Sequence, residues 1–185
     1  TSETATFGND LSTLPNFPAE IRAPAGTLAG VSSFQLHFAS RDIMTPGDAP
    51  NVLVAMNPAA LKANIADVPR GGSIIVNTDE FTKRALQKVG YESNPIEDGS
   101  LDSFHVHPIA LTSMTVEALK EFDVSKKDAE RSKNMFALGL LCWLYNRPTD
   151  GTVEFLNQKF GKKPDILAAN LAAFKVGHEC DDANQ

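Results

Sequence analysis

Residues 51–77 read NVLVAMNPAALKANIADVPRGGSIIVN and carry the strongest indication of fold class in the sequence. This stretch opens with Val52–Met56, an apolar run that is too short for a core helix and is bounded by polar or turn residues. Such a run is typical of a strand that is covered on both faces of a parallel sheet. Asn57 suits the N-cap of a following helix, and Pro58 suits its first position, where the missing N–H costs nothing. The first half of the stretch therefore predicts a strand followed by a helix.

The second half of the stretch repeats this pattern. Gly71 and Gly72 supply a flexible return into Ser73–Val76, a second apolar run that ends at Asn77. Acidic residues then stand in the first turn of a helix predicted over 79–88, where the helix dipole favours negative charge. A strand, a helix, a strand and a helix in this order predict two parallel strands joined by a right-handed crossover.

Asn57 and Asn77 each follow a predicted strand, so both belong to the same edge of the sheet. Ligands of parallel sheets usually bind outside the carboxyl ends of the strands. The two asparagines are therefore candidate binding residues, at helix N-termini that favour anionic groups. A simpler alternative stays open, because asparagine as a plain helix cap explains each position without any ligand.

The remaining chain divides into a proline-rich segment, two further strands and a helical half. Residues 10–26 lack apolar periodicity and are predicted to form a loop. Alternating side chains predict strands over 27–39 and 104–108. We expect helices over 113–122, 125–146, 150–161 and 164–176. The sequence thus predicts an α/β fold with a mostly parallel sheet and a helical C-terminal half.

The helix predicted over 125–146 has two different halves. Ser125 is expected to cap its start, with Asp128 three residues on, in the manner of a capping box. Met135–Tyr145 is almost wholly apolar and should be buried nearly all round. Gly139 is a poor helix former, so its presence there indicates the close approach of another backbone.

Composition limits the class of protein. The chain has 185 residues, of which 42% are hydrophobic and 22% charged, so it can bury one core and is predicted to be a single domain over 1–185. A formal charge of −6 without a basic stripe argues against nucleic acid as a partner. The two cysteines support neither a disulfide framework nor an iron–sulfur site. A cytoplasmic location is expected, because no stretch has the length of a transmembrane helix.

Few residues are candidates for chemistry. His105 and His107 share a strand face, but no third ligand lies at a convincing spacing, so no metal site is predicted. Glu20 and Arg22 lie two apart in a proline-rich segment, where they form either a structural ion pair or a fork for a carboxylate or phosphate. No glycine-rich nucleotide motif or nucleophile motif occurs. No catalytic residue is predicted.

Four segments together resemble one known family: LPNFPAEIRAPAGTLAGVSSFQLHF, GDAPNVLVAMNPAALKANI, GGSIIVNTDEFTKR and SKNMFALGLL. They are similar to the gamma domain of 2-oxoacid:ferredoxin oxidoreductases, in particular to the 2-oxoglutarate branch, where this domain is fused ahead of a thiamine-binding alpha domain. The resemblance runs from about Phe7 to Gly177. It implies the α/β sandwich of the pyruvate-ferredoxin oxidoreductase gamma domain (domain III), in which helices flank the sheet in three layers.

The resemblance also implies a function. The assembled enzyme of this family decarboxylates 2-oxoglutarate oxidatively, forms succinyl-CoA and passes electrons to ferredoxin. Its gamma domain holds neither thiamine diphosphate nor an iron–sulfur cluster, and packs beside the active site formed by the alpha domain and the beta subunit. Ferredoxin is expected to dock through the beta part. The implied role of this chain is thus non-catalytic, with Glu20, Arg22, Asn57 and Asn77 on the coenzyme A and substrate side.

The chain departs from the family pattern in two places. Pyruvate-type relatives read Gly-Pro-Glu-x-Arg-Gly-Gly where this chain has Pro18–Pro24, which keeps Glu20 and Arg22 but replaces both final glycines. The sequence also begins after the family's first strand and Gly-rich turn, and the thiamine-binding part is missing. We therefore expect a fragment truncated at both ends, without turnover by itself, in which another strand fills the place of the missing one or the sheet rearranges.

Three interpretations remain open. The first is an accessory domain that shapes the coenzyme A and 2-oxoacid side of an oxidoreductase. The second is a docking module that contributes subunit contacts only, and it predicts an apolar surface patch and no pocket at the strand ends. The third is an independent α/β domain that binds a small molecule such as a nucleotide, which the missing Gly-rich turn disfavours.

Overall fold

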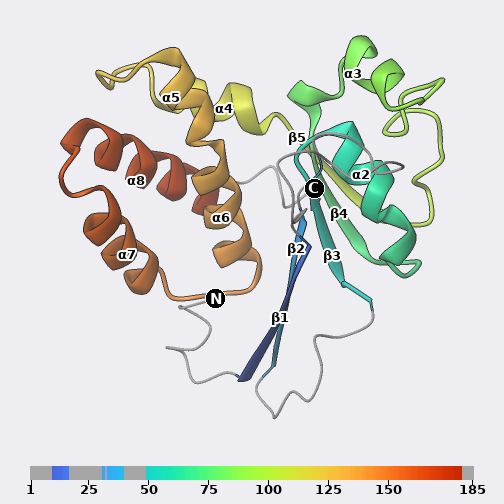
Figure 1. Cartoon of the computed structure of the whole chain (residues 1–185), viewed down its shortest axis with the longest axis horizontal. Helices are drawn as coiled ribbons and strands as arrows, with labels where there is room; N and C mark the ends of the chain where they lie inside the picture. Colours follow the sequence, from blue (N-terminus) through green and yellow to red (C-terminus); the bar gives the residue numbers. More distant parts are fainter. Residues whose placement is uncertain (1–9, 17–30, 32, 40–48, 181–185) are drawn as a thin grey trace. The chain divides into compact units, whose positions relative to one another are not determined.

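The computed structural model describes residues 10–16, 31, 33–39 and 49–180 (Figure 1). For 10–16 and most of 33–39 only the backbone is described. Contacts along the chain group it into two compact units, 1–109 and 110–185, and each is described by itself. The single domain predicted over 1–185 stays a prediction.

A two-stranded antiparallel sheet opens the first unit. Strand β1, Asp10–Asn16, pairs with strand β2, Ser33–Ala39. The prediction of a loop over 10–26 is therefore wrong for residues 10–16, while 17–26 lie outside the described residues. Pro15 is compatible with a strand here because a two-stranded sheet leaves each strand an open edge, where a missing N–H breaks no ladder. The strand predicted over 27–39 is confirmed over Ser33–Ala39.

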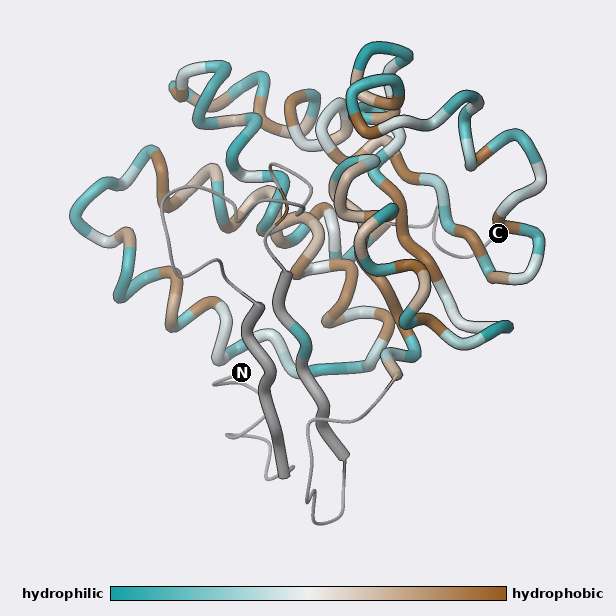
Figure 2. Tube along the Cα trace, turned by 45° about the vertical axis from the view of Figure 1, so that its right-hand side comes forward, coloured by the Kyte–Doolittle hydropathy of each residue, from teal (hydrophilic) through white to brown (hydrophobic). Residues whose placement is uncertain are grey.

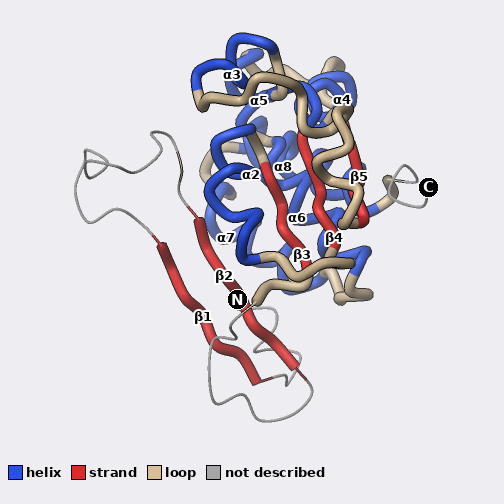
Figure 3. The backbone as a smooth tube through the Cα atoms, turned by 90° about the vertical axis from the view of Figure 1, so that its right-hand side faces the viewer, coloured by secondary structure: helices blue, strands red, loops and turns tan. Residues whose placement is uncertain are grey.

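A three-stranded parallel sheet forms the rest of the framework of this unit. Its order is β3, Val52–Ala55, then β4, Ser73–Asn77, then β5, His105–Ile109, and both pairs are parallel (Figure 3). The register sets Leu53 beside Ile74, and Ile74 beside Val106. The predicted strand–helix–strand unit and its common strand direction are confirmed.

The central strand of this sheet is buried on both sides. Ile74 and Ile75 point to opposite faces, as successive strand residues must, and are only 0% and 3% exposed. Residues of β3 and β4 are mostly hydrophobic, whereas β5 carries His105 and His107 (Figure 2). On one face, hydrophobic residues of β3 and β4 join a core cluster of Ala55, Leu61, Ile74, Val76, Phe81, Leu86 and Leu101. Burial of one such aliphatic side chain stabilises the fold by about 1.5 to 3 kcal/mol.

Short helices follow the carboxyl ends of β3 and β4. Helix α2, Pro58–Asn64, runs on into the 3₁₀ turn η1, Ile65–Asp67. After β4 come the 3₁₀ turn η2, Thr78–Glu80, and helix α3, Lys83–Lys88.

The single helix predicted over 79–88 is therefore wrong. Phe81 leaves the helical region with ψ 46° and is buried in the core cluster. Thr82 then has extended backbone and starts α3 as its N-cap, because its hydroxyl accepts from the amide N–H of Ala85 at 3.3 Å. Anchoring of Phe81 in the core thus divides the segment.

The second unit is helical, as predicted. Its helices are α4, Leu111–Ala118, α5, Lys126–Arg131, α6, Lys133–Leu144, α7, Asp150–Phe160, and α8, Pro164–His178. Helices α6 and α8 pack against each other and cross in the view of Figure 1. Among the described residues, no helix is both long and apolar enough to cross a membrane.

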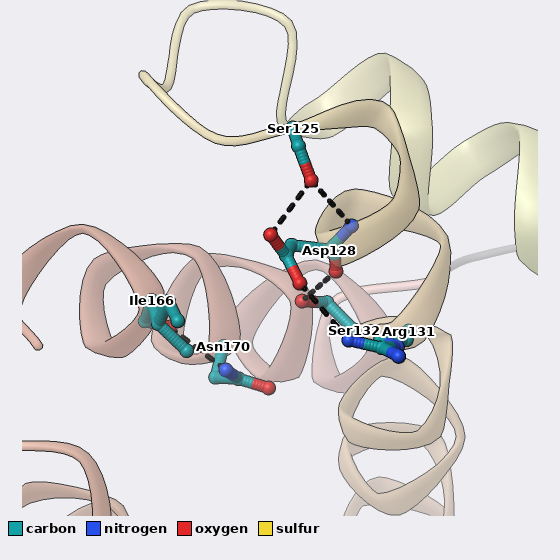
Figure 4. A network of polar contacts seen from close by, with 6 residues as sticks. All are labelled: Ser125, Asp128, Arg131, Ser132, Ile166 and Asn170. Carbon is teal, nitrogen blue, oxygen red and sulfur yellow. Dashed lines mark hydrogen bonds and ion pairs between the residues drawn. The ribbon is translucent and has the colours of Figure 1, made fainter.

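The helix predicted over 125–146 is two helices that meet at Ser132. Ser125 caps α5 as predicted: its hydroxyl accepts from the amide of Asp128 at 3.2 Å and donates to that side chain's carboxylate at 2.6 Å (Figure 4). Ser132 is buried, and its hydroxyl donates to the carbonyl of Asp128 at 3.1 Å. A serine that bonds back to the preceding turn competes with the regular helix, which accounts for the break.

The apolar helix α6 is buried for most of its length. Phe136, Ala137, Gly139, Leu140 and Cys142 are buried. Leu144 and the following Tyr145 are 40% and 38% exposed, so the expected burial of the whole of Met135–Tyr145 is wrong at its C-terminal end. Gly139 lies against the backbone of α8, as the prediction of a close approach requires.

Candidate functional site

Asn57 lies two residues past the carboxyl end of β3 and caps α2. Its backbone is extended, and its side-chain oxygen accepts a hydrogen bond from the amide of Ala60 at 2.8 Å. Pro58 occupies the first helical position, as predicted. Asn57 is half-buried and lies at the edge of the sheet where ligands of parallel sheets usually bind. Capping is thus shown for Asn57, and a binding role is compatible with it.

Asn77 is the last residue of β4 and is fully buried. It pairs in register with Ile109 of β5 and is 0% exposed. Among the described residues, the Asn77 side chain makes no capping hydrogen bond to the 3₁₀ turn η2 that follows. The interpretation of Asn77 as a plain helix cap is therefore wrong. The reason is that α3 begins later and has Thr82 as its cap. Asn57 and Asn77 do lie on neighbouring parallel strands at one edge, as predicted.

A groove of about 350 Å³ lies in the segment that follows β4. The buried Phe81 and Leu86 line it and are called its floor here, and the half-buried Tyr91, which also lines it, is called its wall. Its volume is in the range of small-molecule sites, which combine apolar surface with a few polar groups. Its full lining consists of Phe81, Lys83, Leu86, Gln87, Tyr91, Glu92, Ser93 and Asn94.

The end of α3 fixes the direction of Tyr91. Gly90 has φ +75°, its amide donates to the carbonyl of Gln87, and the amide of Tyr91 donates to the carbonyl of Leu86, both at 3.0 Å. These two bonds make a Schellman motif, which ends the helix with a residue in the left-handed region. Tyr91 and Leu86 occupy the positions of that motif whose side chains commonly touch. The groove wall is therefore set by the helix terminus.

A network of polar contacts orders the loop beside the groove. Ser93 donates to the Asp98 carboxylate, which also accepts from the amide of Ser100 at 2.9 Å. Hydrogen bonds from Ser100 and then Ser93 lower the pKa of Asp98 below its usual value. Burial, and secondarily the negative charge of Asp98, raise the pKa of Tyr91. The wall of the groove thus carries a neutral phenol at neutral pH.

The other predicted residues contribute less to a site. Glu20 and Arg22 lie outside the described residues. His105 is exposed and His107 is half-buried on β5. Within the described ranges, no group of three or more histidines, cysteines or carboxylates is placed to hold a metal ion.

Sequence reasoning missed the groove. A signal was present in Gly90-Tyr91, because a glycine just past a helix followed by an aromatic residue is typical of the Schellman motif. The helix predicted over 79–88 obscured it, since a continuous helix would have left Phe81 on a helix surface. The groove forms because the helical segment is interrupted at Phe81 and Thr82, which lets both Phe81 and the residues of α3 line it.

Comparisons with known proteins place this architecture. Residues 4–180 match the family model of pyruvate ferredoxin/flavodoxin oxidoreductases. The 2-oxoglutarate oxidoreductase subunit KorA of Mycobacterium tuberculosis is 60% identical over 177 residues, or 96% of this chain and 27% of that protein. A solved 2-oxoglutarate:ferredoxin oxidoreductase of Magnetococcus marinus, with 2-oxoglutarate, coenzyme A and succinyl-CoA bound, is 26% identical with a TM-score of 0.67. The match covers 98% of this chain and 27% of that one.

Two solved subunits of the same type share the fold. The pyruvate oxidoreductase subunit PORC of Thermotoga maritima has a TM-score of 0.52 at 14% identity, over 96% of this chain and 83% of that one. The gamma subunit of a keto/oxoacid ferredoxin oxidoreductase of Geobacter sulfurreducens has a TM-score of 0.55 at 13% identity, over 97% and 86%. The predicted gamma-type α/β fold is thereby confirmed. The chain spans 27% of the length of its curated relative. It belongs to the pyruvate ferredoxin/flavodoxin oxidoreductase family.

Proposed function

We propose that the chain is the gamma domain of an enzyme that decarboxylates 2-oxoglutarate oxidatively, forms succinyl-CoA and passes the electrons to ferredoxin. The observation that carries this proposal is the 60% identity, over nearly the whole chain, to a 2-oxoglutarate oxidoreductase subunit. The likeness to a 2-oxoglutarate:ferredoxin oxidoreductase supports the same substrate.

The domain itself is non-catalytic in this proposal. An iron–sulfur cluster of the common type needs four thiolates, and the chain has two cysteines, so a cluster does not fit here. The cluster and thiamine diphosphate belong to other parts of the enzyme, the thiamine-binding alpha domain and the beta subunit, and ferredoxin docks through the beta part. Residues 1–185 act as one domain beside them. By family resemblance, the enzyme is cytoplasmic.

The domain shapes the coenzyme A and substrate side through its sheet edge. Asn57 offers an amide at that edge, while the fully buried Asn77 acts by supporting the strand end. Neither role depends on a helix dipole, because α2, which Asn57 caps, has only 7 residues and Asn77 precedes a single 3₁₀ turn. Lys83, which lines the groove, supplies a positive charge that would bind a phosphate group of the ligand. The Tyr91 ring supplies an aromatic surface on which a flat group of the ligand would stack. Glu20 and Arg22 belong to this side by family resemblance.

A docking module is the alternative, and one observation favours it. Four large apolar side chains are exposed in the second unit: Leu144, Tyr145, Val153 and Phe155. Such residues are common where a protein surface is covered by another polypeptide. Independent nucleotide binding has weaker support, because the sequence lacks a Gly-rich phosphate turn.

The reaction is tested with the complete protein that contains this chain, purified with the subunits that accompany it. We expect ferredoxin reduction that requires both 2-oxoglutarate and coenzyme A, with pyruvate as the matched control. Equal or greater activity with pyruvate would reject the proposed substrate. Activity without coenzyme A would reject the proposed product.

The role of the sheet edge is tested with two variants of Asn57. Asn57→Asp keeps the cap, since aspartate caps as well as asparagine, but it adds negative charge. Asn57→Ala removes the cap and costs about 0.5 to 2 kcal/mol of stability. If the edge faces coenzyme A, Asn57→Asp raises the KM for this anionic substrate while stability is kept. An unchanged KM with normal stability would support the docking module instead.

A further inference from the structure

Lys62 on α2 reaches across to the end of α3. Its ammonium group donates hydrogen bonds to the carbonyl oxygens of Val89 at 2.6 Å and Gly90 at 3.1 Å. These carbonyls lie at the C-terminus of α3, where backbone groups lack partners inside the helix and a cation is favoured. Lys62 therefore ties the helix that follows β3 to the helix that follows β4.

The same ammonium group lies 5.0 Å from the centroid of the Tyr91 ring. At this distance a cation is attracted by the face of an aromatic ring. Tyr91 is the wall of the groove, and its backbone is already directed by the Schellman motif at Gly90. Lys62 thus holds the backbone before Tyr91 and the ring itself, although it does not line the groove.

We propose that Lys62 is a positioning residue for ligand binding in the groove, because it holds both the Tyr91 ring that lines the groove and the backbone that precedes this ring. The inference rests on the proposed function, in which coenzyme A is that ligand. Loss of the ammonium group releases the two carbonyls and the ring together. The wall then takes several positions, and the cost of ordering it is added to each binding event.

The chemical step is not affected, since Lys62 lies on a domain without catalytic residues. A residue of this kind changes KM and leaves kcat, whereas general damage to the domain changes both. The requirement is for a positively charged donor at the end of a long side chain, so arginine is expected to replace lysine. A neutral side chain of similar length, such as methionine, is not.

The test uses the complete enzyme with Lys62→Met, Lys62→Arg and the matched control Lys88→Met. Lys88 is an exposed lysine on α3 that does not line the groove, so its loss changes the charge by the same amount. We expect Lys62→Met to raise the KM for coenzyme A about fivefold or more at unchanged kcat. Lys62→Arg should restore a value within about twofold of the wild type, and Lys88→Met should leave it unchanged.

Tyr91→Leu separates this inference from the proposed function. If Tyr91→Leu raises the KM for coenzyme A and Lys62→Met does not, the groove binds the ligand but the positioning role is overturned. If neither variant changes that KM, the groove is not the coenzyme A site, and the part of the proposed function that places coenzyme A beside this domain's groove is rejected. If Lys62→Met does not fold, Lys62→Gln takes its place, because it also removes the positive charge: a raised KM for coenzyme A there supports the role, and a wild-type KM overturns it.

Discussion

Gly139 on α6 and Gly177 on α8 each lie against the backbone of the other helix. A Cβ atom added to Gly139 would overlap the carbonyl oxygen of Phe174 and lie 2.8 Å from the amide nitrogen of His178. A Cβ added to Gly177 would overlap the carbonyl oxygen of Phe136. Only glycine allows two helices to approach so closely, which explains why residues of low helix propensity stand in both helices.

Gly139→Ala and Gly177→Ala are each expected to destabilise the chain. Alanine favours the helix by about 1 kcal/mol, but forcing two packed backbones apart costs about 1 to 3 kcal/mol or more. Urea denaturation measures the difference, with Glu154→Ala on the exposed side of α7 as the control. A variant as stable as the control would show that the crossing relaxes freely.

Thr152→Val is expected to stabilise the chain. The Thr152 hydroxyl is buried and, among the described residues, has no hydrogen-bond partner. Valine has nearly the same shape, so the change removes an unsatisfied polar group and should add about 1 kcal/mol to the free energy of unfolding.

Thr115→Val is the matched control for that prediction. The buried Thr115 hydroxyl donates to the carbonyl of Leu111 at 2.6 Å. The same chemical change here removes a hydrogen bond and should lower the free energy of unfolding by about 0.5 to 1.5 kcal/mol. Equal shifts in both variants would contradict the assignment of the two hydroxyls.

Ser125→Ala is expected to raise the pKa of the Asp128 carboxyl. That pKa lies below 3.8 chiefly because the Ser125 hydroxyl donates to the carboxylate. A pKa that is lower in the folded chain stabilises the fold above the unfolded pKa, and this contribution is lost as the pH falls through the folded value. Carboxyl chemical shifts followed through an acid titration measure it. Arg131→Met is the control and should have a smaller effect, because Arg131 is a secondary cause.

Both tyrosines of the chain are expected to ionise above pH 10.0 in the folded state. Partial burial raises the pKa of Tyr145, which stays 38% exposed, and partial burial together with Asp98 raises that of Tyr91. The folded chain then keeps protons that the unfolded chain has lost, so stability falls as the pH rises from 10.0 toward the folded values.

Near-ultraviolet absorbance during an alkaline titration measures the two tyrosine pKa values. Asp98→Asn should lower the pKa of Tyr91 while Tyr145 is unchanged. Ionisation of both groups near 10.0 in the folded chain would contradict their burial.

Signals that depend on a few neighbouring residues were predicted from the sequence. The apolar runs at Val52 and Ser73 gave parallel strands, because both faces of such strands are covered. Asn57 and Ser125 were predicted as caps, since capping needs only the next three residues. Gly139 indicated a close backbone, although the partner helix was not identified from the sequence.

Features that depend on distant residues were not predicted. Strand β1 is paired with residues 17 to 29 positions further on, and its own pattern showed no alternation. The groove exists because Phe81 packs in the core and does not continue a helix. It also depends on the contact between Tyr91 and Lys62, which lies on α2, 29 residues earlier in the chain.

By itself, the sequence determined the direction of the strands, the helical second half and the family, because hydrophobic periodicity and caps are local properties of the chain. The tertiary structure decided where helices break, that Asn77 is a buried strand end, and that a groove exists beside α3. The physical reason is that burial and wall positions arise from contacts between segments far apart in the chain, and the free energy of those contacts overrides local preference.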